Sequence, residues 1–434
     1  MATAEVLEQV NGWVTKDLAR ATSEVEGILA SAPDQKFGVS FGRDAAIASE
    51  FLLDIYEKHP EKTEYLTPVK NSLITMALYQ GQEVDNEEDE EPGKIHHEIR
   101  VEEAFVNIPD IYKKNQEILD HLQSSRFPVK GERGKRTMNY YGSVDSTPLF
   151  IVLASRYLLL TKDKEFFDFL NPHIRKAIDW MEEYGDMLGD GYIRFSAKNL
   201  YALRIQGWMD SFDSIEISPN QRPKEPIALV EVQGYTYQAY ITAAELYRQA
   251  GDVEYSKHLY QKAGILKQRF NTEFWMEDES FFAQALSGDN RQVRDIVSNV
   301  GHLLVTGIVD DEKIPDVVDR LMQPDMLTPW GIRTRSLNSP NFSDLEPYAY
   351  HRGGTIWPHD NGMITRGLRR LRYDSEASII ENRLLSAEVV LKHIYGITSE
   401  ELFIVDRNHR LRPYQDAQKP QGWAAAAYKA ITTV

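Results

Sequence analysis

Helical periodicity, interrupted by long irregular segments, constrains the fold of this chain more than any other feature. Over residues 3–30, apolar residues such as Val10 and Val14 recur at the spacing of one helical face. Similar patterns recur along the chain, whereas strand patterns are few and short, near 192–195 and 281–283. Further helices are expected after Pro60 up to Gly81 and at 44–55, 145–160, 164–184, 228–250, 252–273, 292–308, 311–323, 361–372, 374–395 and 420–432.

The predicted helices follow one another in pairs with short links, and longer segments rich in Gly, Pro and Trp fall between the pairs. These segments are 37–44, 81–100, 131–145, 195–226, 325–360 and 396–423. If the pairs close into a ring, the long segments share one rim, where they can build one pocket. We therefore predict an all-α fold, an (α/α)6 barrel with long loops on one rim, as a single domain over residues 1–434.

An open α-solenoid that binds other proteins is the alternative architecture for a chain of helix pairs. Such arrays repeat their sequence with a period of roughly 34–47 residues, and this sequence contains no such repeat. The aromatic content of the long segments also exceeds what simple turns need. The closed barrel is therefore the preferred interpretation.

The composition argues against several functional classes. A net charge of −17 argues against nucleic acid or an anionic membrane as a partner. The chain has no Cys, so we expect neither a disulfide nor a metal bound by thiolates. Residues 1–10 lack the pattern of a signal peptide, and no apolar run approaches the roughly 18 residues that span a bilayer. We expect a cytoplasmic protein, and the sequence leaves its oligomeric state open.

Motifs for metals and phosphates are missing from the sequence. The histidine clusters are His96 with His97, and His351 with His359, and neither has the spacing of a zinc site with a third ligand. The sequence also contains no Gly-rich phosphate loop before a Lys. We therefore expect no metal and no cofactor, and we favour acid–base chemistry by carboxylates.

The central segment 207–214 combines carboxylates with aromatic rings. Asp210 and Asp213 lie three residues apart, beside Trp208 and Phe212. Aromatic faces stack on the apolar C–H faces of a pyranose, while carboxylates bind hydroxyl groups or move protons. The segment is therefore typical of a sugar site, although both Asp could instead cap a helix or close an Asx turn.

A pair of carboxyl groups from distant segments could carry out glycoside hydrolysis. One group protonates the leaving oxygen, and the other, in its ionised form, lies across the sugar ring. The candidates are Asp210 in the central segment and Glu401 in the last long segment.

Seven segments, read in order, resemble one known family. They are residues 41–44, 94–100, 141–148, 207–211, 350–360, 401–403 and 420–425. Together they span about residues 37–430 and are similar to the glucosidase domain of glycogen debranching enzymes, the amylo-α-1,6-glucosidases. That family is related to glucoamylases and to the mannosylglycerate and glucosylglycerate hydrolases.

The resemblance implies an (α/α)6 barrel and inverting hydrolysis of an α-linked glucoside or a short α-glycoside. It implies that Asp210 is the general acid and Glu401 the general base, and that Arg43 and Asp44 hold the hydroxyl groups of the non-reducing sugar. Trp357 falls in the motif of the pocket wall. We then expect a protonated Asp210 with a raised pKa, an ionised Glu401, and carboxyl groups roughly 6.5–9.5 Å apart. The residues expected to bind the carbohydrate are Arg43, Asp44, Glu98, Arg100, Tyr141, Trp208, Asp213, Gln233, Trp330, His351, Trp357, His359 and Trp423.

Two positions depart from the family pattern. Met209 stands where Lys is common, and Glu400 precedes Glu401 where Pro is frequent, so either of two adjacent Glu could be the base. The 434 residues also contain neither the β-domain nor the transferase module of many relatives. A short glycoside or a compatible solute is therefore expected as much as glycogen.

Two other functional classes stay open on the same barrel. One is a non-hydrolytic sugar-binding protein. The other is a sugar isomerase or epimerase, which would need His97, His351 and His359 to converge for proton transfer.

Overall fold

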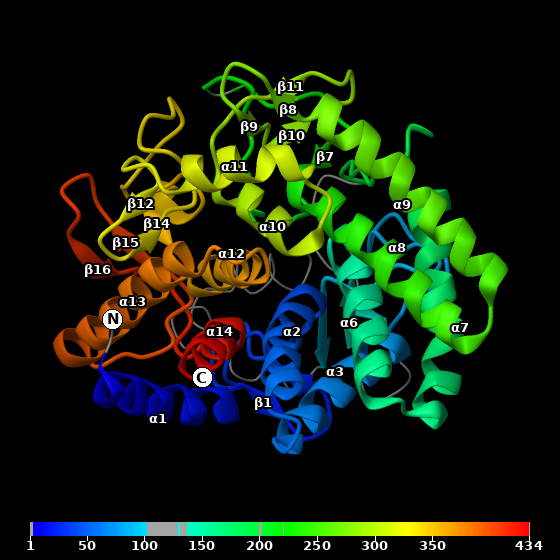
Figure 1. Cartoon of the computed structure of the whole chain (residues 1–434), viewed down its shortest axis with the longest axis horizontal. Helices are drawn as coiled ribbons and strands as arrows, with labels where there is room; N and C mark the ends of the chain where they lie inside the picture. The colour runs from blue at the N-terminus through cyan, green and yellow to red at the C-terminus, as the bar shows by residue number, and fades with distance from the viewer. Residues whose placement is uncertain (1–2, 102–128, 131–136, 199–201, 220, 434) are drawn as a thin grey trace.

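The computed structural model describes residues 3–101, 129–130, 137–198, 202–219 and 221–433. This part of the chain is mostly helical and contains twelve α-helices (Figure 1). Their bounds are α1 Ala4–Arg20, α2 Gly42–Lys58, α3 Leu66–Leu78, α6 Ser146–Thr161, α7 Lys164–Trp180, α8 Val230–Ala250, α9 Val253–Glu273, α10 Leu303–Thr306, α11 Ile314–Leu321, α12 Pro358–Arg370, α13 Asp374–Val390 and α14 Gly422–Thr432. Among the described residues, every helix is too short or too polar to cross a membrane.

Short strands order the long segments between the helices. They are β1 Thr22–Ser23, β2 Gly27–Ile28, β3 Ser40–Phe41, β4 Glu98–Val101, β5 Val129–Lys130, β6 Thr137–Tyr140, β7 Ala228–Leu229, β8 Trp275–Met276, β9 Phe281–Phe282, β10 Ala285–Leu286, β11 Gln292–Val293, β12 Leu327–Thr328, β13 Gly331–Ile332, β14 Thr355–Ile356, β15 Phe403–Val405 and β16 Leu411–Pro413. The larger sheets have the antiparallel orders β3-β4-β6-β5, β14-β15-β16 and β11-β10-β7. Because β3, β7 and β14 come just before α2, α8 and α12, these sheets fix the starts of those helices.

Six helices contact one another in a closed order. Helix α2 packs on α6, α6 on α8, α8 on α10, α10 on α12, α12 on α14, and α14 again on α2. Figure 1 shows these six around the centre, with α1, α3, α7, α9, α11 and α13 outside them. This order is consistent with the predicted ring of helix pairs.

The burial of inner and outer helices follows their sequence patterns. Helix α6 is buried at nearly every position of its first three turns, and it is apolar on all sides. Helix α7 instead repeats Phe166, Leu170, Ile174 and Ile178 on one face and exposes the opposite, charged face. A helix that is apolar all round must lie between neighbours, whereas an amphipathic helix covers a core from outside. The two patterns therefore place α6 in the ring and α7 around it.

The starts of several inner helices meet at one end of the ring. Arg43 in the first turn of α2 bonds Asp145, which directly precedes α6. Likewise, His302 directly before α10 contacts Asp360 in the first turn of α12. The last turns of α2, α12 and α14 line a cavity together. The ring therefore has an N-terminal end and a C-terminal end, which differ in chemistry.

The expected helix over 3–30 is too long. Helix α1 ends at Arg20, because the next residues form the antiparallel hairpin β1–β2. The hydroxyl of Thr22 donates to the carbonyl of Leu18 and caps the last turn.

The expected helix over 292–308 is wrong for most of its length. Its first residues form β11, which pairs with β10, and a 3-10 turn over Ser298–His302 precedes the short α10. A short apolar run does not distinguish a buried strand from a helix by periodicity alone. The expected strand at 192–195 reduces to one bridge between Phe195 and Ile227, while 281–282 does form β9.

Candidate active site

Arg43 and Asp145 form a buried ion pair at the N-terminal end of the ring. Arg43 Nε donates a 2.6 Å hydrogen bond to Oδ2 of Asp145, and Ser143 Oγ donates to Oδ1 at 2.8 Å. The side chains of Arg43 and Asp145 are 3% and 0% exposed, so water competes little for this pair. A second nitrogen of Arg43, Nη1, lies 3.9 Å from Oδ2 of Asp210. The ion pair thus fixes the cation that faces Asp210.

Asp210 is the partly exposed carboxyl group of this cluster. Its side chain is 29% exposed, whereas Asp44 and Glu401 are each 5% exposed. Burial raises the pKa of Asp210 to about 6, although the positive charge of Arg43 opposes the rise. Asp210 can therefore hold a proton in mildly acidic solution and remain accessible to a leaving group.

Glu401 lies close enough to Asp44 and Asp210 for their charges to act on it. Tyr350 Oη donates to Oε1 of Glu401 at 3.3 Å, and the Gln418 amide donates to Oε2 at 3.3 Å. Burial raises the pKa of Glu401 to about 8, and the negative charges of Asp44 and Asp210 add to the rise. The hydrogen bond from the Gln418 amide acts in the opposite direction and lowers the pKa. The three carboxyl groups therefore form one coupled cluster.

Glu400 has different surroundings from its neighbour Glu401. Its Oε1 lies 3.7 Å from Lys419 Nζ. Burial raises its pKa to about 8 as well, but the other charges that act on it are Lys419 and Glu388. The geometry therefore brings Glu401, and not Glu400, together with Asp210.

The order of the two pKa values differs from the expected one. We expected the higher pKa on Asp210, as the general acid, and an ionised Glu401. Burial gives Glu401 the higher value, about 8 against about 6. Between these values the pair shares one proton, and a coupled pair titrates as a unit. Asp44, which accepts a 3.0 Å hydrogen bond from Gln421 Nε2, has a pKa that burial raises to about 7.

Aromatic rings from three of the predicted segments pack together beside these carboxyl groups. The Trp208 ring lies edge-on to Trp357 and His359, with centroids 5.6 and 5.1 Å apart. His359 stacks on Trp423 at 3.5 Å, and Trp357 stacks on His351 at 5.1 Å. The structure thus brings together five of the seven aromatic and histidine residues predicted for the site.

His351 and His359 are held in their neutral form. His351 Nδ1 accepts a hydrogen bond from the Ser211 amide at 3.2 Å, which leaves the ring proton on Nε2. Burial and the positive charge of Arg43 hold the pKa of His351 well below its ordinary value. Burial lowers the pKa of His359 in the same way. Neutral rings can exchange hydrogen bonds with sugar hydroxyl groups without carrying charge.

Glu98, Arg100 and Asp213 lie around this cluster and are engaged in ion pairs. Arg100 Nη2 lies 2.8 Å from Oε2 of Glu98, whose charge also acts on Asp210. Asp213 Oδ2 lies 3.7 Å from Nη1 of Arg352. These residues are near the cluster, with their charges already partly compensated.

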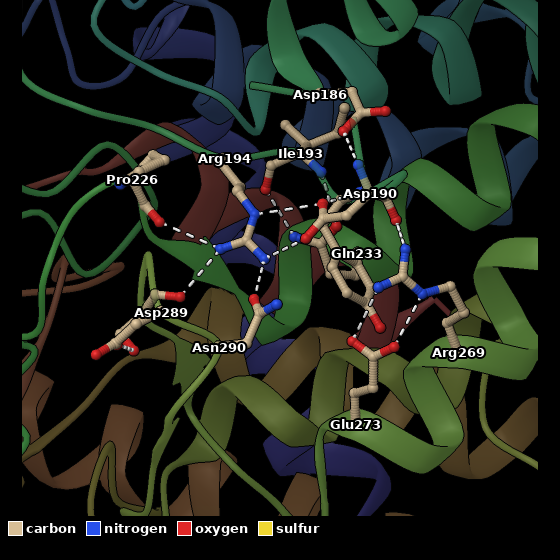
Figure 2. Close-up of polar contacts among 12 residues, drawn as sticks. Asp186, Asp190, Ile193, Arg194, Pro226, Gln233, Arg269, Glu273, Asp289 and Asn290 are labelled. Carbon is tan, nitrogen blue, oxygen red and sulfur yellow. Dashed lines mark hydrogen bonds and ion pairs between the residues drawn. The ribbon is translucent and has the colours of Figure 1, made fainter. Parts of the chain in front are cut away.

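Gln233 is not free to bind a substrate. Figure 2 shows its amide beside Ile193, within the polar network around Arg194. The side-chain oxygen of Gln233 accepts a 3.0 Å hydrogen bond from the backbone N–H of Ile193. Its side-chain nitrogen donates 2.9 Å hydrogen bonds to the carbonyls of Ile193 and Leu229. Both donor hydrogens are used, and the residue is 0% exposed. Gln233 therefore ties the 193–195 segment to α8.

Tyr141 and Trp330 also lie apart from the ring cluster. Tyr141 Oη donates to the carbonyl of Tyr79 at 2.8 Å, and the negative charges that act on Tyr141 are Glu90 and Glu88. Trp330 Nε1 donates to the carbonyl of His409 at 2.8 Å, across two hairpins. The contacts of both residues are with neighbouring loops.

His302 is a member of the cluster that sequence reasoning missed. Its Nε2 lies 2.8 Å from Oδ1 of Asp360, its Nδ1 lies 2.5 Å from Oη of Tyr235, and Trp208 stacks on its ring at 5.9 Å. His302 fell inside the expected helix 292–308. Because α10 begins at Leu303, His302 instead occupies a helix start, like Arg43 and Asp360. These three residues share a position in or directly before the first turn of an inner helix.

Glu231 is a further buried carboxyl group near the start of α8. It is 1% exposed, and burial raises its pKa to about 7. Within the described residues, no group of three or more His, Cys, Asp or Glu side chains is arranged to hold a metal ion. The arrangement is suited to hydrogen bonding and proton transfer by carboxyl groups.

A family model described as "Mannosylglycerate hydrolase MGH1-like glycoside hydrolase domain" matches residues 106–392, more than half of the chain. The chain belongs to this family of MGH1-like glycoside hydrolases. It is therefore a glycoside hydrolase family member, and a carbohydrate is the implied substrate. A search of curated proteins finds no match.

Solved structures share the fold of this MGH1-like chain at low sequence identity. The GH63 mannosylglycerate hydrolase from Thermus thermophilus aligns with a TM-score of 0.64 at 11% identity, over 98% of this chain and 99% of that one. A rhamnosidase from Klebsiella oxytoca aligns with a TM-score of 0.60 at 13% identity, over 99% of this chain and 64% of the other. A sialidase aligns with a TM-score of 0.50 at 14% identity, over 63% of this chain and 24% of the sialidase. The MGH1-like chain thus has a GH63-like, mostly helical fold.

Proposed function

We propose that this protein is an inverting hydrolase of a short α-linked glycoside, with Asp210 as general acid and Glu401 as general base. The proposal includes one (α/α)6 domain over residues 1–434. The observation that carries it is the coupled cluster of Asp210, Glu401 and Asp44, which lies beside Arg43 and a wall of tryptophans. Membership of a glycoside hydrolase family supports the same proposal.

The exposure of the two carboxyl groups suits their proposed roles. Asp210 is partly open to solvent, so a leaving group can lie beside it while the non-reducing sugar occupies the enclosed side. Glu401 is enclosed, and its hydrogen bonds to Tyr350 and Gln418 hold both oxygens. It would remove a proton from a water molecule that attacks the anomeric carbon, while Asp210 protonates the leaving oxygen.

Neighbouring residues would position the sugar ring. Arg43, held by Asp145, presents a fixed cation to hydroxyl groups, and Asp44 offers an acceptor next to it. The indole rings of Trp208 and Trp357 supply apolar surface for the C–H face of a pyranose. Substrate recognition would therefore rest on a small number of rigid groups.

The proposed substrates are small α-glycosides. The matching family and the similar structure from Thermus thermophilus both carry the name of mannosylglycerate hydrolase, and the sequence segments resemble amylo-α-1,6-glucosidases. We propose mannosylglycerate, glucosylglycerate and short α-glucosides as the first compounds to test.

The decisive experiment measures hydrolysis of these compounds by the parent protein and three variants. Asp210→Asn and Glu401→Gln should each reduce turnover by at least about 10²–10⁴-fold, the usual contribution of acid–base catalysis. Glu400→Gln is the matched control, because Glu400 faces Lys419 instead of the cluster, and it should keep near-normal turnover. Proton NMR of the first-formed anomer should show inversion of configuration.

Other outcomes of the same experiment would reject the proposal. Near-normal turnover by either carboxyl variant would remove that residue from its role, and a retained anomer would refute the inverting mechanism. A changed sugar without cleavage would indicate an isomerase or epimerase. Sugar binding without any chemistry would indicate a binding protein.

A further inference from the structure

The C-terminal end of the ring contains a cavity of about 910 Å³ that is separate from the proposed active site. It is formed by the last turns of α2, α12 and α14, together with side chains of α6, α8 and α10. None of the residues that line it belongs to the carboxyl and aromatic cluster at the other end. Its apolar walls include Phe51, Ile55, Ile241, Val305, Ala430 and Ile431.

The charged lining of this cavity is predominantly basic. The cationic residues are Lys58, Arg156, Arg366, Arg369, Arg370 and Arg372, and the acidic residues are Asp54, Glu57 and Glu381. The chain as a whole carries a net charge of −17. A local excess of cations in a strongly acidic protein is therefore a specific feature of this end of the ring.

Half of these cations are already paired with carboxylates. Arg156 and Arg366 both bind Glu50 and Asp54: Arg156 Nη2 lies 2.9 Å from Asp54 Oδ1, and Arg366 Nε lies 2.6 Å from Asp54 Oδ2. Arg369 binds Glu381 at 2.5 Å. The acidic groups of the lining are thereby largely used.

The other three cations, Lys58, Arg370 and Arg372, make no ion pair with the described residues. Arg370 Nη1 donates a 3.0 Å hydrogen bond to the backbone carbonyl of Val305. Burial and the positive charges of Arg366 and Arg156 lower the pKa of Arg370, against the negative charges of Asp54 and Glu57. The helix dipole favours cations at the ends of α2 and α12, but it gives none of these three cations a carboxylate partner.

We propose that this cavity binds a small organic phosphate, with its phosphate group on Arg370, Arg372 and Lys58 and its organic part against the apolar walls. Three cations call for more than one negative charge, which a phosphate ester carries and a monocarboxylate does not. Guanidinium groups bind phosphate oxygens through paired N–H donors. The mixture of cations and apolar walls favours an organic ester over the bare ion.

The test uses the full-length protein with inorganic phosphate and phenyl phosphate as probes. Binding is followed by thermal melting and by calorimetry, with sodium chloride to hold the ionic strength constant. Both probes should raise the melting temperature, because a ligand that binds the folded state stabilises it. Phenyl phosphate should bind more tightly than inorganic phosphate, since it also fills the apolar part.

Variants locate the binding. The double variant Arg370→Gln, Arg372→Gln should weaken phenyl phosphate binding at least about tenfold, the effect of losing one charged hydrogen bond. The double variant Lys16→Gln, Lys164→Gln is the matched control, because it removes two exposed cations that are not part of the cavity lining. Asp210→Asn should also bind normally, which separates this site from the proposed active site. If the double variant does not fold, the single variant Arg372→Gln, at an exposed position, is used instead and should also weaken phenyl phosphate binding.

Specific results would overturn the proposal. It fails if neither probe stabilises the protein beyond sodium chloride, or if the double variant binds as tightly as the parent. Loss of binding in Asp210→Asn, with retention in the arginine variants, would place the phosphate at the other end. Equal affinity for both probes would refute the organic part of the ligand.

Discussion

The two ends of the helix ring hold opposite kinds of charge. The N-terminal end gathers carboxyl groups with raised pKa values, about 7 for Asp44 and about 8 for Glu401. The C-terminal end gathers arginines. Burial alone would raise the pKa of Asp54 there, but the positive charges of Arg366 and Arg156 outweigh burial and lower it. Helix starts favour negative charge and helix ends favour positive charge, so one set of helices separates the two.

The difference lies in how well each carboxyl group is compensated. At the C-terminal end, Asp54 is bound by two arginines. At the N-terminal end, Arg43 is shared between Asp145 and Asp210, and the contacts that hold the Glu401 carboxylate are hydrogen bonds from neutral groups. Groups with perturbed pKa values mark functional sites because catalysis needs protons held near neutral pH. The contrast therefore favours the N-terminal end as the place of acid–base chemistry.

The largest expected effect concerns Arg43, the cation that holds the buried Asp145. Arg43→Met leaves Asp145 buried without its ion pair and should cost about 3–5 kcal/mol of unfolding free energy. Arg366→Met should cost only about 1–2 kcal/mol, because Arg156 still binds both Glu50 and Asp54. Urea denaturation measures both values, with the exposed Lys16→Met as control. Equal losses at the two ends would contradict the comparison.

The next effect is the pH dependence of hydrolysis. Asp210, with a pKa of about 6, and Glu401, with a pKa of about 8, share one proton between these values. The proposed mechanism needs that single proton on Asp210, which is the less populated of its two positions, and kcat/KM should still follow a bell with limbs near these two values. Beyond either limb the rate should fall about tenfold per pH unit. A rate that keeps rising above the upper limb would show that the shared proton is not needed. Glu400→Gln should leave the profile unchanged.

Most of the fold could be predicted from the sequence because long amphipathic patterns dominate it. The starts of α7, α9 and α13 differ from expectation by a residue at most. The region 292–308 failed because its helix is only four residues long, Leu303–Thr306, and such a short helix has no period of its own. That failure also removed His302 from the predicted site.

The structure groups some residues of the predicted site and separates others. Trp208, His351 and Trp357 were each expected to bind the carbohydrate, and they do pack together. Gln233 has a similar polar character, but its amide is consumed by Ile193, which no local pattern indicates. The pKa order of Asp210 and Glu401 depends on burial by distant segments, so sequence reasoning could not supply it.

The smallest expected effect is on stability as a function of pH. It distinguishes the two ends of the ring because groups at the N-terminal end titrate near neutral pH, whereas the arginines at the C-terminal end stay charged. Asp44, Glu231 and Glu401 have folded pKa values of about 7, 7 and 8, well above about 4 in an unfolded chain. The folded state binds their protons more tightly, so the stability they contribute is lost as pH rises from the unfolded values through the folded ones. The buried His351 and His359 act oppositely: their pKa values are lowered, so stability falls as pH drops through about 6.5.

The melting temperature should therefore fall by a few degrees along an alkaline limb between about pH 6.5 and 8, where the carboxyl groups lose their protons; below about pH 6.5 the histidines partly offset the same trend. Glu401→Gln removes a group that titrates on the alkaline side, so it should flatten that limb. Arg366→Met changes a cation that stays charged throughout this range, so it should lower the melting temperature equally at every pH. If Arg366→Met altered the shape of the curve, or Glu401→Gln left the alkaline limb unchanged, the titrating groups would not be confined to the N-terminal end of the ring.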